Sequence, residues 1–142
     1  MDNTIHYLNT DLDLICEEDL TDLANAFEVR GAFPLHVTGG DDGKWYATFE
    51  TDEQHAEPDP NISRMLTIIE SLPEPLRRIW MRCTLRVFDI GYDCGAEPWG
   101  FHQSLSTDVL ARIAAAGASL RITLYPDRHH DRGITVSEIS SE

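Results

Sequence analysis

The sequence predicts a single α+β domain in which helices cover one face of a mostly antiparallel sheet. The length of 142 residues and the ordinary fractions of apolar (42%) and charged (25%) residues are typical of one globular domain. Segments with alternating apolar residues, as in strands, are interleaved with segments of helical apolar spacing. We therefore expect one domain over residues 1–126 and a polar, flexible tail over residues 127–142.

The N-terminal part predicts a strand and then a helix. Residues 4–16 alternate from Leu12 onward, and a change of phase near residues 8–10 predicts a bulge. Asp19 can cap a helix over residues 19–30, and Gly31 stands where a left-handed end residue is wanted. The apolar stripe of this helix consists of Leu20, Leu23, Ala24 and Phe27.

A β-hairpin follows. Residues 33–37 and 45–49 are two strand-like runs, and the turn between them, residues 39–43, is rich in glycine and aspartate. Pro34 has no N–H to donate to a neighbouring strand. The first strand of the hairpin is therefore expected to have an unpaired edge at that point.

The second half predicts two helices, a strand, a third helix and a last strand. Asp59-Pro60 is typical of an N-cap followed by a first-turn proline. The strand over residues 84–94 changes phase at Val87-Phe88, which predicts a second bulge. Ser106 is expected to cap the third helix, and residues 118–125 alternate again. The order β-α-β-β-α(α)-β-α-β predicts a ferredoxin-like core, β-α-β-β-α-β, with an added helix and strand.

The charge is strongly acidic and unevenly distributed. The formal net charge is −14, and residues 1–60 hold 15 acidic residues against Arg30 and Lys44, a net of −13. Such a field disfavours nucleic acid and anionic membranes as partners, and it favours a basic protein. Solubility alone is the alternative explanation. The absence of a basic, apolar leader and the odd number of cysteines predict a cytoplasmic protein with reduced thiols, although a Cys16–Cys94 disulfide stays open.

Two segments, FDIGYDCGAEPWGF and LARIAAAGASLRITLYP, carry a resemblance to known proteins. The opening LNTDLDL and the hairpin FPLHVTGGDDGKWYATFETDEQ fit the same impression, so that it covers most of residues 5–126. The chain resembles a group of small bacterial proteins known only as hypothetical proteins or domains of unknown function, whose relatives have been discussed beside toxin-immunity proteins. The resemblance implies one bacterial domain and assigns no catalytic residue.

The loop after the fourth predicted strand is the first candidate binding site. Glycines permit unusual backbone conformations there, and Pro98 stiffens the loop. Large aromatic residues on a stiff loop are typical binding anchors, although they could instead fold back over the end of the sheet. The expected binding residues are Tyr92, Asp93, Trp99, Phe101 and His102.

Four aspartates form the second candidate site. In a ferredoxin-like sheet the first and fourth strands are neighbours, so Asp11 and Asp13 could face Asp89 and Asp93. Gathered carboxylates could bind magnesium or calcium, or act as an acid–base pair. The alternative is a solvated face with the acids apart.

Other polar groups carry weaker signals. The histidines have no metal-binding spacing, and His129-His130 is typical of a solvated tail. Cys94 stands beside Asp93 without a cation, so it is not an activated nucleophile. An arginine group, Arg77, Arg78, Arg82 and Arg86, is expected to pair within the chain, or else to contact an acidic partner or second copy.

No catalytic motif is present, and no cofactor is expected. The leading hypothesis is a protein-binding module, of immunity type, for a basic protein partner. The alternatives are a small metal-dependent hydrolase using the four aspartates, and a homodimeric structural protein. The sequence leaves monomer and homodimer open.

Overall fold

The computed structural model describes residues 3–126 as a five-stranded mixed sheet with four helices, which is a single small α+β domain. The expected tail, residues 127–142, lies outside the described residues. The elements in chain order are β1 (His6–Cys16), α1 (Thr21–Val29), β2 (Ala32–Gly39), β3 (Trp45–Thr51), α2 (Pro58–Glu70), α3 (Glu74–Arg82), β4 (Leu85–Asp93), α4 (Thr107–Ala115) and β5 (Ser119–Tyr125).

The strand order across the sheet is β2-β3-β1-β4-β5. The pairs β2–β3, β3–β1 and β1–β4 are antiparallel, whereas β4 and β5 are parallel. A parallel pair needs a crossover connection, and α4 lies in the segment that joins these two strands. The long strand β1 is therefore central, and β2 and β5 form the two edges.

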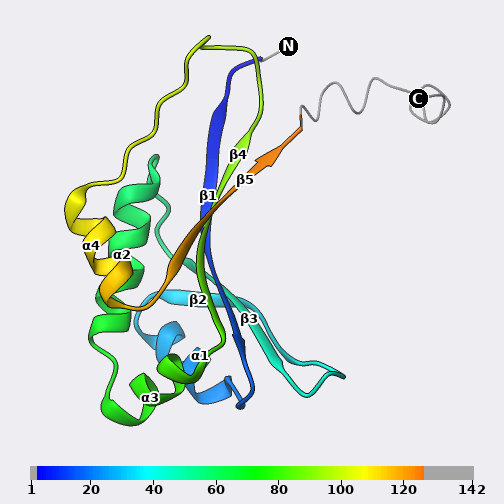
Figure 1. Cartoon of the computed structure of the whole chain (residues 1–142), viewed down its shortest axis with the longest axis vertical. Helices are drawn as coiled ribbons and strands as arrows, with labels where there is room; N and C mark the ends of the chain where they lie inside the picture. The colour runs from blue at the N-terminus through cyan, green and yellow to red at the C-terminus, as the bar shows by residue number, and fades with distance from the viewer. Residues whose placement is uncertain (1–2, 127–142) are drawn as a thin grey trace, which may run out of the picture.

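All four helices lie on the same side of the sheet (Figure 1). The fully buried side chains between the two layers include Leu12 and Phe49 from the strands and Phe27 and Trp80 from the helices. The Phe27 ring lies 4.7 Å from the Phe49 ring and 6.4 Å from the Trp80 ring, measured between centroids. No helix of residues 3–126 lies over the opposite side of the sheet, which we call the open face.

Helix ends follow sequence rules in three places. Ser106 caps α4 by accepting a hydrogen bond from Val109 N at 3.1 Å, as predicted. Gly31 and Gly117 have φ of +105° and +73°, the left-handed conformation that suits a residue ending a helix. The prediction for Asp59 was wrong, because α2 begins at Pro58, two residues before Pro60, and Glu57 is its N-cap residue. The Asp59 carboxylate instead accepts from Ser106 N at 3.1 Å.

One predicted bulge is confirmed and the other is wrong. The β1–β4 register shifts between Tyr7 and Asn9, as the phase change there indicated. No shift occurs at Val87, whose side chain faces the open side yet is only 4% exposed. Arg121 reaches from β5 across β4 to Asp13 on β1, on the same face as Val87. Val87 and Phe88 point to opposite faces of the sheet, and both are buried. The change of apolar phase at this point therefore reflects burial on both faces and not a bulge.

Candidate binding surface on the open face of the sheet

The predicted binding loop divides into a buried part and an exposed part. Tyr92 is 5% exposed on the helix side, and its ring packs against Tyr7 and Phe101 at centroid distances of 5.9 Å and 5.5 Å. Phe101 folds back over the end of the sheet, which was the alternative considered for the loop aromatics. Trp99 is 98% exposed and so covers nothing. Phe101 therefore covers part of the sheet end, whereas Trp99 and His102 are exposed on the loop.

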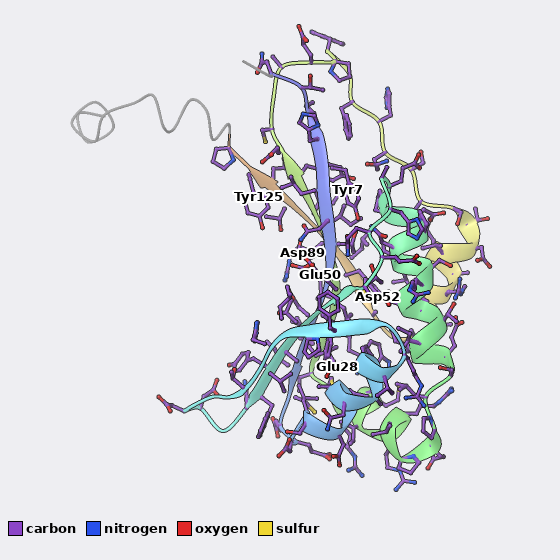
Figure 2. All side chains as sticks on the ribbon, turned by 180° about the vertical axis from the view of Figure 1, so that it is seen from behind. Tyr7, Glu28, Glu50, Asp52, Asp89 and Tyr125 are labelled. Atoms are coloured by element: carbon purple, nitrogen blue, oxygen red, sulfur yellow. The ribbon has the colours of Figure 1, made fainter. Side chains whose placement is uncertain are left out.

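The structure brings three of the four candidate aspartates together on the open face. Asp11 on β1 lies directly opposite Asp89 on β4, and Asp13 is the next open-face residue of β1. Asp93 is separate, because it lies opposite His6 at the far end of the strand pair. Figure 2 shows Asp89 on the side of the sheet away from the helices.

Arg121 occupies the place between two of these carboxylates. Its Nη2 donates to Asp89 Oδ2 at 3.1 Å and also to Asp13 Oδ2. Thr48 Oγ1 donates to Asp13 at 2.9 Å, and Thr123 Oγ1 donates to Asp89 at 2.7 Å. A guanidinium and two hydroxyls thus satisfy both carboxylates. Over residues 3–126, no group of three or more His, Cys, Asp or Glu side chains is arranged to hold a metal ion.

Asp11 is left with acidic neighbours and no cation. Its closest partners are Asn9, whose Nδ2 lies 3.4 Å from Asp11 Oδ1, and Glu50 on β3, whose Oε2 accepts from the same Nδ2 at 2.5 Å. Within the described chain, neither Asp11 nor Glu50 forms an ion pair. The pKa of Asp11 is raised to about 8, mainly by burial. The hydrogen bond with Glu50 and the charges of Glu50, Asp13 and Asp89 also contribute to this rise.

A hollow of about 450 Å³ is lined by Glu50, one member of this pair of carboxylates, but not by Asp11. Its wall includes Asn9, Glu50, Gln54 and Tyr125. Gly91 makes room for it, because an added Cβ there would lie 3.1 Å from Asn9 Oδ1 and 3.3 Å from Tyr125 Cε2. The hollow therefore offers the Glu50 carboxylate, the side-chain amides of Asn9 and Gln54, and the Tyr125 ring.

A second hollow, of about 330 Å³, is apolar and lies at the end of the sheet that the loop covers. Phe101 from the loop and Ile122 and Leu124 from β5 contribute to its lining, and Cys94 and Asp93 lie at its rim. The expected loop residues Trp99 and His102 do not line it.

The sequence did not single out Glu50, Asn9, Tyr125 or Arg121. Glu50 directly follows the predicted hairpin strand, residues 45–49. If that strand continues by one residue, Glu50 shares the parity of Thr48 and faces away from the core. Arg121 and Tyr125 share the polar phase of the last strand in the same way. No local pattern says that β5 pairs with β4, which is what brings these residues to the aspartates.

The remaining polar groups mostly serve the fold. Cys16 and Cys83 are buried, and both thiols point to the Ile79 carbonyl, at 4.0 Å and 3.5 Å, while Cys94 lies at the other end of β4. The Cys16–Cys94 disulfide left open by the sequence is excluded by this placement. The predicted arginine group binds within the chain: Arg77 to the Glu70 carbonyl, Arg78 to Glu74, Arg82 to Glu18 and Arg86 to carbonyls that include Gly117.

A buried polar cluster fixes the acidic loop to β1. Asn61 is fully buried, and its Nδ2 donates to Tyr7 Oη at 2.7 Å while its Oδ1 accepts from His55 N at 2.9 Å. Tyr7 Oη and Thr10 Oγ1 lie 2.7 Å apart. Burial raises the pKa of Tyr7. Because each of these groups has a partner, the cluster holds the loop in place and is not a free reactive site.

Comparison with known proteins supplies no relative. No family model, no curated protein and no solved structure matches the chain. Over residues 3–126, no helix is long and apolar enough to span a membrane.

Proposed function

We propose that this chain is a protein-binding module whose open sheet face receives a lysine or arginine side chain of a basic protein partner. The observation that carries the proposal is the carboxylate pair Asp11–Glu50. The pair shares one amide donor, lies among further acids and has no cation of its own within the described residues. Keeping two such carboxylates together lowers the stability of the fold, and perturbed groups of this kind are common at functional sites.

The chemistry of the hollow fits a cationic side chain. An ammonium or guanidinium group at the Asn9–Glu50 wall would replace carboxylate repulsion by attraction and would favour loss of the proton from Asp11. Tyr125, 44% exposed, presents a ring over which a cation gains further attraction. An anionic or apolar ligand would gain neither interaction.

The wider charge distribution supports the same partner class. Three of the five strands, β1, β2 and β3, come from residues 1–60, which hold a net charge of −13. They lie side by side at one edge of the sheet. A basic protein would be steered toward this edge, with an association rate that falls as salt is added.

A toxin-immunity role is one form of this proposal and rests on the resemblance noted in the sequence.

We also propose that the first four strands with α1 and α2 form a ferredoxin-like core, because the strand order β2-β3-β1-β4 and its antiparallel pairing suit that arrangement. We do not propose the metal-dependent hydrolase, since Arg121 already neutralises Asp13 and Asp89.

Titration calorimetry with a nonalysine peptide tests the site with a defined probe. The variant Asp11→Asn/Glu50→Gln should bind the peptide about tenfold more weakly than the native chain, which corresponds to about 1.4 kcal/mol. The control Glu28→Gln/Glu53→Gln replaces two exposed acids that form no ion pair within residues 3–126. It removes at least as much negative charge at neutral pH as the test variant does, because a pKa of about 8 keeps Asp11 largely protonated there. The control should change the affinity by less than about threefold, through the general field alone. Equal effects of the two variants would refute a localised site.

A pull-down from a bacterial cell extract tests for a natural partner. The native chain, used as bait at low and at high salt, should retain a basic protein at low salt and release it at high salt. The Asp11→Asn/Glu50→Gln bait should lose that protein, whereas the control bait should keep it. A captured protein that is acidic, or that both baits retain equally, would contradict the proposal.

A further inference from the structure

The two edges of the sheet are protected unequally. On β2, Pro34 and a register shift between Pro34 and His36 interrupt the edge, and both devices discourage pairing with another chain. On β5, residues 119–125 contain no proline or lysine, and their register with β4 is continuous. Among the described strands, none lies on the outer side of β5. Within residues 3–126, this edge therefore presents backbone donors and acceptors that no other strand takes up, along a regular strand.

Within the part of the chain that the structure describes, the helix-side surface of β5 is apolar and largely exposed. Leu120, Ile122 and Leu124 are 39%, 60% and 64% exposed, although their neighbours Phe88, Ile90 and Tyr92 on β4 are buried. In Figure 1, β5 runs away from α4 and α2, so that no helix covers its far end. A strand with this pattern and no cover is typical of a pairing site.

We propose that β5 pairs antiparallel with β5 of a second copy of this chain, about a two-fold axis at Ile122. The strand is self-complementary in this register. Ile122 lies opposite Ile122 of the other copy, and Leu120 lies opposite Leu124. Arg121, the charged residue of β5, lies opposite Thr123 of the other copy and is already bound to Asp13 and Asp89 of its own chain. The pairing places no like charges directly across from each other.

The charge distribution also selects this edge for self-association. With a net charge of −14, two copies repel one another most strongly where β2 and β3 lie, since these strands belong to the acidic residues 1–60. The sheet order places β5 at the opposite edge, in the nearly neutral part of the chain. Strand pairing and contact among the six aliphatic side chains would bury on the order of 1,000 Å² in total, the lower limit for a specific interface. We therefore expect a weak dimer, with a Kd on the order of 10 µM.

Sedimentation equilibrium of the full chain over about 1–500 µM tests the proposal. The native chain should pass from monomer to dimer across this range. The variant Ile122→Lys places two ammonium groups opposite each other and should weaken dimerisation at least tenfold. The control Phe33→Lys changes an exposed apolar residue, 42% exposed, on the opposite edge and should leave it unchanged. Circular dichroism verifies that both variants fold.

A cross-link fixes the register independently of stability. In the variant Ile122→Cys, oxidised glutathione should join two chains through residue 122, as identified by mass spectrometry of the cross-linked peptides. In Ser119→Cys it should not, because residue 119 lies opposite residue 125 of the other copy. A monomer at every concentration, a dimer that Ile122→Lys leaves intact, or a cross-link at 119 in place of 122 would overturn the proposal. None of these results depends on whether a basic partner binds the open face.

Discussion

Replacing Asp11 by asparagine should stabilise the protein at high pH and leave it unchanged at low pH. The Asp11 carboxyl has a pKa of about 8 in the folded chain against an ordinary value of 3.8. Between these two pH values the folded chain keeps a proton that the unfolded chain has released. The free energy of unfolding therefore falls as the pH rises through this interval, and above about pH 8 the whole destabilisation is present. Asparagine cannot ionise, so it avoids that loss.

The magnitude follows from the structure. The difference between a pKa of 3.8 and one of about 8 corresponds to an upper bound of roughly 5–6 kcal/mol. Asp11 is only partly buried on a face that water reaches, and screening reduces this to on the order of 2 kcal/mol at pH 9. Asparagine keeps an acceptor for Asn9 and gains a donor toward Glu50, so the local hydrogen bonds survive the change.

Urea unfolding at pH 4, 7 and 9, followed by tryptophan fluorescence, measures the effect. The Asp11→Asn variant should match the native chain at pH 4 and exceed its free energy of unfolding by about 2 kcal/mol at pH 9. The control Asp13→Asn should instead destabilise the protein by about 1 kcal/mol at pH 7, because it breaks the ion pair with Arg121. The reasoning fails if Asp11→Asn has the same effect at all three pH values, or if the two variants behave alike.

Three further predictions concern the surroundings of the open face and the ends of the elements. Arg121→Met leaves two carboxylates without their cation and should lower the free energy of unfolding by about 1–2 kcal/mol at pH 7, measured with urea, whereas Arg121→Lys should lose less. Ser106→Ala removes the cap of α4 and should lower the melting temperature through a loss of about 1 kcal/mol; an unchanged temperature would contradict the capping role. A thiol reagent added to the native chain should modify Cys94 first and reach the two buried cysteines only on unfolding, and mass spectrometry showing equal modification would refute this.

Much of the fold could be predicted because it depends on local rules. Period-two alternation located the strands and period-3.6 spacing located the helices. Ser106 and Gly31 gave helix boundaries because their side-chain chemistry and backbone freedom act within a few residues. The errors arose where a distant contact overrides a local pattern. Val87 is buried although it faces the open side, and Asp59 accepts from the N-terminus of α4 instead of capping its own helix.

The candidate site was predicted only in part. The sequence indicated that Asp11, Asp13 and Asp89 share one face, since parity along a strand is local. It could not show that Arg121 lies between two of them, because that depends on the parallel pairing of β4 and β5. The predicted magnesium or calcium site depended on Asp13 and Asp89, and both of these carboxylates are paired with Arg121. The loop aromatics were predicted as binding residues from composition alone. In the structure Phe101 packs on Tyr92, and of the two only Trp99 is almost fully exposed.

The sequence by itself determined the α+β class, the elements in order and the concentration of acidic charge in residues 1–60. The first two follow from the local spacing of apolar residues, and the third follows from a count of charged residues. Tertiary structure alone decided which carboxylates acquire a cation. Asp13 and Asp89 acquire Arg121, whereas Asp11 and Glu50 are brought together by the β1–β3 pairing with only an amide between them. The interaction of charges depends on their separation in space and on their burial, and neither quantity is a property of distance along the chain.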